Sequence, residues 1–277
     1  MIIILGSTVP VRNGINNCFI YGDLWECECI QIYSTSSRKW DIKDKPDNDM
    51  VVKFKSAYKK SNVRMVVSHI PFLVNLCAED MELQKKSVAR LRTELVYNNK
   101  FGIQYTVLHP GSHKDKEKAI EVIAKNINMV LDEFDNLNQC VILLETMSGQ
   151  GNYLGSLEEI AQIINLIKNK NCIGVCLDIA HIYQNGYDIN NNYDDIKKII
   201  DKIIGLEFIK ALHINDSLTR LESHVDRHAF NGEGYINIET FRKIVNDSNF
   251  LSLPKILELP DIYRSQEALN ILKSLKE

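Results

Sequence analysis

Short apolar runs alternate with longer amphipathic segments along most of the chain. Each run is often β-branched and is bounded by polar or turn residues, which is typical of a buried strand. We expect eight strands, at residues 2–5, 29–33, 64–68, 105–108, 141–144, 173–177, 209–212 and 255–257. Between them, apolar residues recur at helical spacing, which predicts helices over residues 82–97, 116–134, 156–168, 192–204 and 238–246. The third helix opens with Ser156 and Glu159, the spacing of a capping box.

The alternation of strands and helices predicts an α/β fold, namely a single (β/α)8 TIM barrel over residues 1–277. Such a barrel typically needs roughly 250 residues, and the chain has 277. The alternative is a doubly wound open sheet, which should carry a glycine-rich turn after its first strand. Residues 6–10 (Gly-Ser-Thr-Val-Pro) are not such a turn, so the barrel is favoured. The polar stretch 34–49 is expected to form a loop after the second strand.

Residues of the types that bind metal ions follow six of the predicted strands. In chain order they are His69, His109, Glu145, Asp178, His213 and Glu258, with His181 one helical turn after Asp178. A further pair, Asp226 and His228, lies between the last two strands, and its spacing points both side chains to the same side of an extended segment. The carboxyl ends of barrel strands open on one face, which holds the active site, so we expect these side chains to meet there.

These nine side chains offer only nitrogen and oxygen donors. Such a donor set favours an open catalytic metal site over a closed structural one. Zinc is expected for mixed histidine and carboxylate ligation, with manganese or iron at one site as the alternative. Nine donors are too many for one ion, whereas three ions use them all if one carboxylate bridges two ions. A single histidine or carboxylate after a strand is more often a loop or capping residue, so the prediction rests on the joint pattern.

The composition is that of an ordinary globular protein, with 45% hydrophobic and 25% charged residues. The net charge of −3 leaves an anionic partner open, because four of the negative charges belong to predicted ligands. Seven irregularly spaced cysteines, without a secretion signal or a membrane-length apolar run, predict an intracellular protein with no membrane partner. The cytoplasm is expected for a bacterial or viral source, with a nucleus or organelle as alternatives. Cys172 and Cys176 could be metal ligands by spacing, but apolar neighbours favour core packing.

Several short motifs surround the predicted ligands. They are His69-Ile-Pro-Phe-Leu-Val-Asn-Leu76, Leu108-His-Pro-Gly-Ser-His113, Leu144-Glu-Thr-Met-Ser-Gly-Gln-Gly151, Cys176-Leu-Asp-Ile-Ala-His181, Gly186-Tyr-Asp188, His213-Ile-Asn-Asp-Ser217, Val225-Asp-Arg-His228, Gly232-Glu-Gly234 and Leu257-Glu-Leu-Pro260. In these motifs, their order and their separations, the chain resembles the endonuclease IV family of apurinic/apyrimidinic endonucleases. The resemblance covers essentially the whole chain.

The resemblance implies a xylose-isomerase-like TIM barrel with three zinc ions. The first ion would be held by His69, His109 and Glu145; the second by Asp178, His213 and Glu258, with Glu145 bridging to the first; and the third by His181, Asp226 and His228. It implies a base excision repair enzyme that hydrolyses the phosphodiester 5′ to an abasic site in duplex DNA and leaves a 3′-hydroxyl. Glu145 would be the catalytic carboxylate, close to the attacking hydroxide. The partner would be double-stranded DNA with abasic or 3′-blocked damage, bound by a monomer.

The resemblance also implies side chains that enter the DNA and stabilise a flipped-out abasic nucleotide. Arg38, Phe72 and Leu73 stand at those places, with core packing as the alternative for Phe72 and Leu73. Many family members have tyrosine where Phe72 stands, and phenylalanine keeps the stacking face but lacks the hydroxyl. Arg227 is a further candidate for contact with DNA phosphates.

Three polar residues are expected to orient the metal-binding imidazoles: His113, Asn215 and Asp216. The first loop departs from the family pattern, because residues 6–14 lack the opening histidine that family members usually have. First-loop contacts to DNA are therefore not carried over to this chain, although no predicted metal ligand is lost.

Two other classes of protein compete with this interpretation. Sugar isomerases and epimerases with similar barrels also place carboxylates and histidines at strand ends, but they typically use one or two ions. They would not need Asp226 and His228 in addition to His181. A non-catalytic module that binds damaged DNA through the same surface is the second alternative, and it would bind an abasic duplex without cutting it.

Overall fold

The computed structural model describes residues 3–36, 39–40, 42, 45–134 and 140–277. Eight parallel strands close into a barrel, in the spatial order β1-β12-β9-β8-β6-β4-β3-β2. These strands are β1 (Leu5–Thr8), β2 (Cys29–Ile32), β3 (Met65–His69), β4 (Tyr105–Leu108), β6 (Val141–Glu145), β8 (Ile173–Asp178), β9 (Ile209–His213) and β12 (Lys255–Leu257). The predicted (β/α)8 barrel is therefore confirmed.

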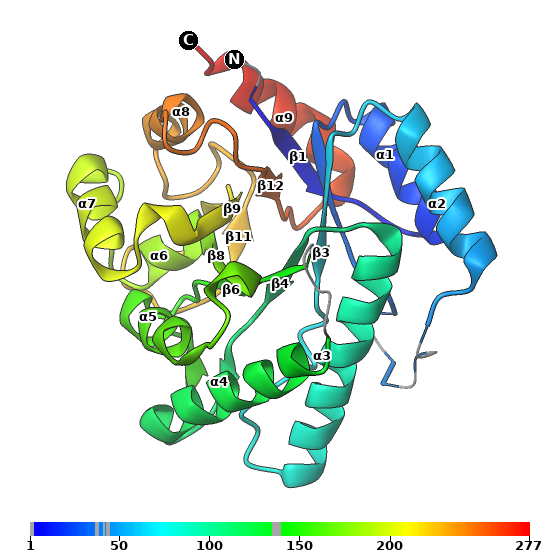
Figure 1. Cartoon of the computed structure of the whole chain (residues 1–277). Coiled ribbons are helices and arrows are strands. Elements are labelled where there is room, and N and C mark those ends of the chain that lie inside the picture. The colour runs from blue at the N-terminus through cyan, green and yellow to red at the C-terminus, as the bar shows by residue number, and fades with distance from the viewer. Residues whose placement is uncertain (1–2, 37–38, 41, 43–44, 135–139) are drawn as a thin grey trace.

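Helices lie around the outside of this barrel (Figure 1). They are α1 (Cys18–Leu24), α2 (Asn48–Lys60), α3 (Met81–Phe101), α4 (Lys116–Asp132), α5 (Leu157–Leu166), α6 (Ile179–Gln184), α7 (Tyr193–Ile203), α8 (Ile238–Asn246) and α9 (Ser265–Ser274), with 3-10 turns at Ile15–Asn17, Lys170–Cys172, Leu206–Phe208 and Ile262–Arg264. The capping box at Ser156 and Glu159 is present at the start of α5. In the part of the chain that the structure describes, no helix combines the length and apolar run that a membrane crossing needs.

Two short ribbons lie beyond the barrel strands. β5 (Gly111–Ser112) pairs with β7 (Tyr153–Leu154), and β10 (Asp216–Ser217) pairs with β11 (His228–Ala229), both antiparallel. The second ribbon joins Ser217, four residues after the end of β9, to His228. It therefore holds the segment with the predicted ligands Asp226 and His228 against the barrel.

Apolar residues pack on both sides of the barrel strands. The interior is packed with Cys29, Val67, Val107, Leu143, Cys176, Ala211 and Ile256. A larger cluster lies between the strands and the helices, with Phe54, Phe101 and Phe241 among its largest fully buried side chains. All seven cysteines are buried and free, as expected for core thiols.

The first strand lies further along the chain than predicted. The apolar run suggested residues 2–5, whereas β1 is Leu5–Thr8, and residue 2 lies outside the described part. Gly6, Ser7 and Thr8 pair with Cys29, Ile30 and Gln31 of β2. Residues 6–8 are not an apolar run, but they can form this strand because Gly6 allows the backbones of β1 and β2 to approach closely.

Gly6 provides a test of this closure, because a Cβ there would lie 1.6 Å from the carbonyl oxygen of Cys29. We expect Gly6→Ala to lower the free energy of unfolding by at least about 3 kcal/mol, the upper end of ordinary overpacking. Gly102→Ala is the control: Gly102 has a φ of 79° and open space around it, so we expect a loss of only about 1–2 kcal/mol. Urea denaturation measures both changes, and equal losses would contradict this account of β1.

Candidate metal centre

The barrel delivers the predicted ligands to one face. His69, Glu145, Asp178 and His213 are the last residues of their strands, and His109 and Glu258 directly follow theirs. The neighbouring strands β8 and β9 run parallel, and their register places Asp178 opposite His213. Eight of the nine predicted ligands fall into three groups whose donor atoms lie within 4.8 Å of one another.

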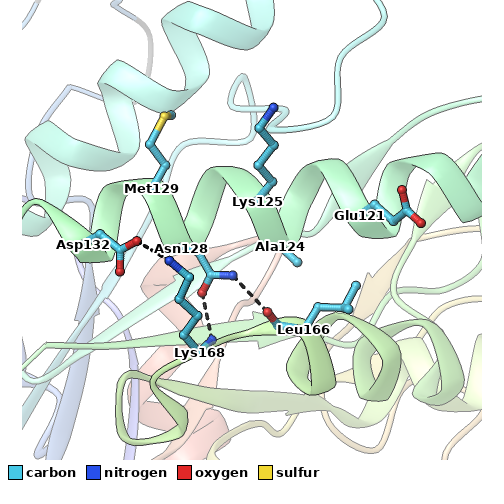
Figure 2. Close-up of a pocket in the computed structure, with 8 residues that line it drawn as sticks. All are labelled: Glu121, Ala124, Lys125, Asn128, Met129, Asp132, Leu166 and Lys168. Atoms are coloured by element: carbon cyan, nitrogen blue, oxygen red, sulfur yellow. Dashed lines mark hydrogen bonds and ion pairs between the residues drawn. The ribbon is translucent and has the colours of Figure 1, made fainter.

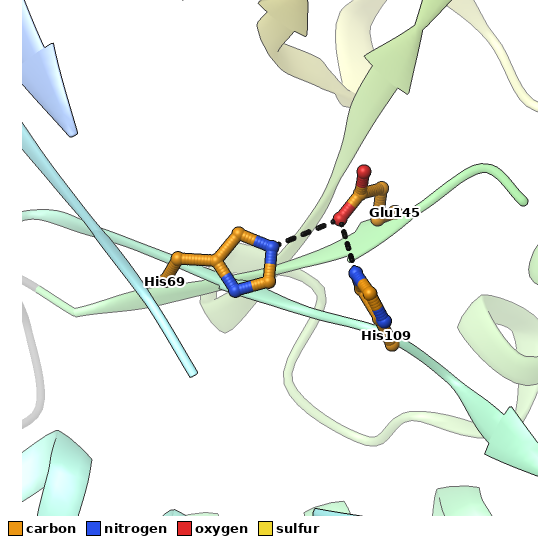
Figure 3. A group of neighbouring side chains, drawn as sticks. All are labelled: His69, His109 and Glu145. Atoms are coloured by element: carbon orange, nitrogen blue, oxygen red, sulfur yellow. Dashed lines mark hydrogen bonds and ion pairs between the residues drawn. The ribbon is translucent and has the colours of Figure 1, made fainter. Parts of the chain in front are cut away.

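The first group consists of His69, His109 and Glu145, and both imidazoles point to the same carboxylate oxygen (Figure 3). Glu145 Oε2 lies 3.1 Å from His69 Nε2 and 3.0 Å from His109 Nε2. The two rings are nearly perpendicular, with centroids 5.1 Å apart. Three donors from three strands thus surround one point.

The second group lies on the other oxygen of the same carboxylate. Glu145 Oε1 is 2.9 Å from His213 Nδ1. That nitrogen is also 3.3 Å from Glu258 Oε2 and 3.6 Å from Asp178 Oδ2. Glu145 therefore presents one oxygen to each group, which is the geometry that a bridging carboxylate requires.

The third group lies toward solvent. His181 Nε2 is 3.1 Å from Asp226 Oδ1 and 3.4 Å from His228 Nε2, and His228 Nε2 is 3.7 Å from Asp226 Oδ1. Asp178 Oδ2 also lies 3.7 Å from His228 Nε2, so either carboxylate can serve this group. The Asp226 side chain is 38% exposed, whereas the His181 side chain is buried.

These spacings fit metal ions. Two ligands of one tetrahedral zinc lie about 3.3 Å apart when each metal–ligand distance is about 2.0 Å. Glu145 and Asp178 are fully buried and, among the described residues, imidazoles are their only ion-pair partners. The two facing nitrogens of His181 and His228 have room for a shared cation. Buried carboxylates with nitrogen donors at these distances are a donor set suited to dications.

The pKa shifts show that the site attracts positive charge. Burial opposes ionisation of Glu145 and Asp178, but the imidazoles outweigh it, lowering the pKa of Glu145 well below its usual range and that of Asp178 to about 2. Burial likewise opposes the charge on His181 and His213, but nearby anionic groups raise the pKa of His181 to about 10 and that of His213 well above its usual value. Protons on these imidazoles occupy the place that dications would take.

Most of the imidazoles are fixed by a bond from their other ring nitrogen. Three of them donate this N–H to a backbone carbonyl: His69 to Ile70 at 2.7 Å, His181 to Thr146 at 2.8 Å and His228 to Glu258 at 3.2 Å. Each bond leaves the ring nitrogen that faces the site free of its proton when the imidazole is neutral. Such outer bonds set the tautomer and direction of a metal-binding histidine.

Two amide side chains complete the support. Gln31 on β2 contacts His213 Nε2 through Oε1 at 2.9 Å and donates from Nε2 to Glu258 Oε1 at 2.6 Å. Asn215 donates to Asp178 Oδ2 at 2.8 Å and accepts from the backbone N–H of Glu258 at 2.7 Å. Within the described chain, Asn215 thus contacts two of the predicted carboxylate ligand residues, and not an imidazole as expected. Gln31 was not predicted, although an amide inside the apolar strand β2 was a signal that could have been used.

Among the described residues, Asp216 and His113 have hydrogen bonds to backbone N–H groups and not to the predicted imidazole ligands. The Asp216 carboxylate accepts from four backbone N–H groups, those of Ser217, Gly232, Gly234 and Ile236. A Cβ at Gly234 would lie 2.4 Å from Asp216 Oδ1, so this loop needs glycine there. His113 Nδ1 accepts from the backbone N–H of Asp115 at the start of α4. Both residues shape loops.

The predicted DNA-contacting residues have different surroundings. Phe72 is 72% exposed and lines a cavity of about 160 Å³ together with His109, Asp226 and Arg227. Leu73 is partly buried and packs against the core, as its alternative prediction stated. Arg38 lies outside the described residues. The cavity therefore brings two exposed aromatic residues, Phe72 and Tyr153, and the exposed cation of Arg227 to the edge of the metal groups.

The fold and this site define a class of protein. The family model described as "Xylose isomerase-like TIM barrel" matches residues 25–276. A "Probable endonuclease 4" of Chloroflexus aggregans is 34% identical over 278 residues, which cover 98% of this chain and 96% of the relative. One from Trichlorobacter lovleyi is 33% identical, over 98% and 99% of the two chains.

Solved structures agree with these relatives. Endonuclease IV from Thermus thermophilus has a TM-score of 0.86 and 28% identity, and the match covers 98% of each chain. A D-tagatose 3-epimerase-like protein has a TM-score of 0.71 and 20% identity, over 98% and 96% of the two chains, and shows the shared fold alone. The chain belongs to the endonuclease IV family of the xylose isomerase-like TIM barrels.

Asn215 gives a test of the metal centre that does not depend on activity. We expect Asn215→Ala to weaken zinc binding by about 10–100-fold, because Asp178 and the N–H of Glu258 lose their partner. Competition with a chromogenic chelator measures this affinity. Asn128→Ala is the matched control, since Asn128 similarly bridges Leu166 and Lys168 on the outside of the barrel (Figure 2). Equal zinc affinity in the two variants would rule out the orienting role.

Proposed function

We propose that this protein is a DNA repair endonuclease that hydrolyses the phosphodiester 5′ to an abasic site in duplex DNA and leaves a 3′-hydroxyl. The observation that carries the proposal is the arrangement of two donor groups on the two oxygens of Glu145, with a third group from His181, Asp226 and His228. Family membership supports it, because relatives that match the full chain are named endonuclease 4. All nine ligands come from one chain, so a monomer suffices.

The proposed cofactor is zinc, at three positions. His69, His109 and Glu145 would hold the first ion; Asp178, His213 and Glu258 the second, with Glu145 shared; and His181, Asp226 and His228 the third. Manganese or iron at one position is compatible with the same donors. When bound, these dications would polarise the phosphate and supply a nucleophile derived from water.

Three side chains of the protein would contribute directly to this chemistry, one in the metal site and two at its rim. Glu145 holds two donor groups at a fixed separation, because its two oxygens point in different directions within a fully buried site. Arg227 places a positive charge at the rim, where a DNA phosphate would approach. Phe72 presents an exposed ring face beside His109, on which a displaced nucleotide could stack.

Selectivity for an abasic site follows from the low cost of moving it. A nucleotide without a base is unpaired and weakly stacked, so taking it out of the helix requires less free energy than flipping an intact nucleotide. The cavity beside the metal groups is lined by side chains with both polar and apolar atoms, including Phe72, Tyr153 and Gln150. Recognition then needs no contact with a base edge.

One assay tests the proposed reaction. The zinc-loaded protein is incubated with a duplex that carries a single tetrahydrofuran abasic analogue, and we expect a 5′ nick that leaves a 3′-hydroxyl. A sugar isomerase with this fold would leave the duplex intact, and a damage-binding module would retain it uncut. Absence of a metal-dependent nick would therefore overturn the proposal.

Glu145→Gln provides the sharpest change to the site. The amide keeps the size of the side chain but removes the charge that faces both donor groups, so we expect nicking to fall by about 10³-fold or more. The thermal unfolding profile should still show a folded barrel. Glu239→Gln, which alters an exposed glutamate on α8, should nick at the wild-type rate. Wild-type nicking by Glu145→Gln would refute the bridging role.

Arg227 tests the DNA-facing rim through its salt dependence. Because a phosphate contact releases about one counterion, we expect Arg227→Ala to weaken duplex binding and to reduce the slope of log K against log salt by about 1. Fluorescence anisotropy with a labelled abasic duplex measures this slope. Arg242→Ala, on α8 beside Glu239, is the control and should leave the slope unchanged. An identical slope for Arg227→Ala and wild type would remove Arg227 from the contact surface.

A further inference from the structure

A buried ion pair on α3 faces the loop that follows β2. Arg90 is 2% exposed and Glu94 is fully buried, and Arg90 Nε donates to Glu94 Oε1 at 2.8 Å. The pair lies one helical turn apart on the inner side of α3, and neither residue belongs to the metal groups. Both side chains have further polar partners, and all of those described lie in this one loop.

Glu94 binds the first part of the loop. Its Oε2 accepts from Ser34 Oγ at 2.7 Å, and its Oε1 accepts from Thr35 Oγ1. Ser34 Oγ in turn accepts from Ser68 Oγ at 3.3 Å, and Ser68 directly precedes the predicted ligand His69. Glu94 thus connects α3 to the end of β2 and, through Ser34, to the residue beside the first metal group.

Arg90 binds the loop further on. Its guanidinium donates to Thr35 Oγ1, to the carbonyl oxygen of Ser36 at 2.6 Å and to the carbonyl oxygen of Lys39. The planar guanidinium group of Arg90 therefore binds three acceptors at different points of the loop. A lysine could not reproduce this arrangement, because its ammonium is a single point of contact.

Stability alone is a poor explanation for this pair. Removing two charges from water costs several kcal/mol per ion, and well-packed apolar residues of the same volume are often as stable or more so. A buried pair of this kind is better explained by the conformation that it specifies. Here that conformation is the position of Thr35, Ser36 and Lys39 against Arg90 of α3.

We propose that Arg90 and Glu94 are positioning residues that hold residues 34–36 and Lys39 of the β2–α2 loop in the conformation that engages DNA. The inference rests on the proposed function, because it assigns the loop a role in binding the duplex. The loop lies on the active-site face: it begins two residues after Gln31, which contacts His213 and Glu258. Its first residue, Tyr33, has its ring centroid 5.6 Å from that of His69. A displaced loop would weaken DNA binding without changing the donor groups.

Arg90→Lys separates this role from simple loss of charge. The lysine can still pair with Glu94, but it cannot reach Thr35, Ser36 and Lys39 together. We expect KM for nicking of the abasic-analogue duplex to rise about tenfold, which corresponds to about 1.4 kcal/mol. We expect kcat at saturating DNA and bound zinc to stay within about twofold of wild type. Trypsin cleavage after Lys39 in the folded protein should become at least about fivefold faster.

Two further variants control the experiment. Thr35→Val removes the hydroxyl that joins Arg90 to Glu94 while keeping a similar shape, and it should shift KM and trypsin cleavage in the same direction by a smaller factor. It also serves if Arg90→Lys fails to fold. Arg92→Lys lies on the same helix and changes an exposed pair with Glu133, so it should match wild type in every readout.

The readouts distinguish this inference from the proposed function. Wild-type KM and trypsin cleavage in both Arg90→Lys and Thr35→Val, with active enzyme, would overturn the positioning role alone. A fall in kcat with unchanged KM and unchanged cleavage would also overturn it, because the effect would then lie in the metal site. Since trypsin cleavage needs no nuclease activity, a wild-type protein that fails to nick would overturn the proposed function and leave the loop measurement interpretable.

Discussion

The structure depends on one electrostatic constraint: the carboxylates of Glu145 and Asp178 are buried side by side in the same site. Glu145 and Asp178 are removed from water and are surrounded, within the described residues, by imidazoles rather than by lysine or arginine. Anions in such a place require compensating positive charge. The imidazoles of His181 and His213, whose pKa values the nearby anionic groups raise, can supply this charge as protonated rings. Metal binding would replace those protons, so the buried carboxylates favour the binding of dications.

The barrel meets this constraint through parallel register and outer bonds. The strands carry the predicted ligands to one face, and backbone carbonyls, Gln31 and Asn215 hold them in place. Asp216 lies further from the predicted ligands, and it accepts from three backbone N–H groups in the loop that follows His228. The support thus extends from the ligands to the loops, and the Arg90–Glu94 pair extends it to the loop after β2.

The sequence was sufficient for seven of the eight barrel strands and for the convergence of the predicted ligands, because both follow from short-range pattern and barrel topology. It was insufficient where a side chain acts on a distant partner. Gln31 contacts His213, 182 positions away, and Arg90 contacts Ser36, 54 positions away, and neither pairing leaves a local pattern. His113 shows the converse: a histidine in a characteristic motif accepts from the backbone N–H of Asp115, the N-cap residue of α4. Burial and register, which decide such roles, appear only in the folded chain.

The central claim is that this one chain holds three metal ions, with Glu145 shared between two of them and Asp226 in the third group. Native mass spectrometry of the zinc-reconstituted protein measures the number of ions directly. The account predicts a mass increase of three zinc ions per chain, and two for His228→Ala, which removes an imidazole of the third group. A wild-type chain that saturates at fewer than three ions, or a His228→Ala chain that still binds three, would contradict the account.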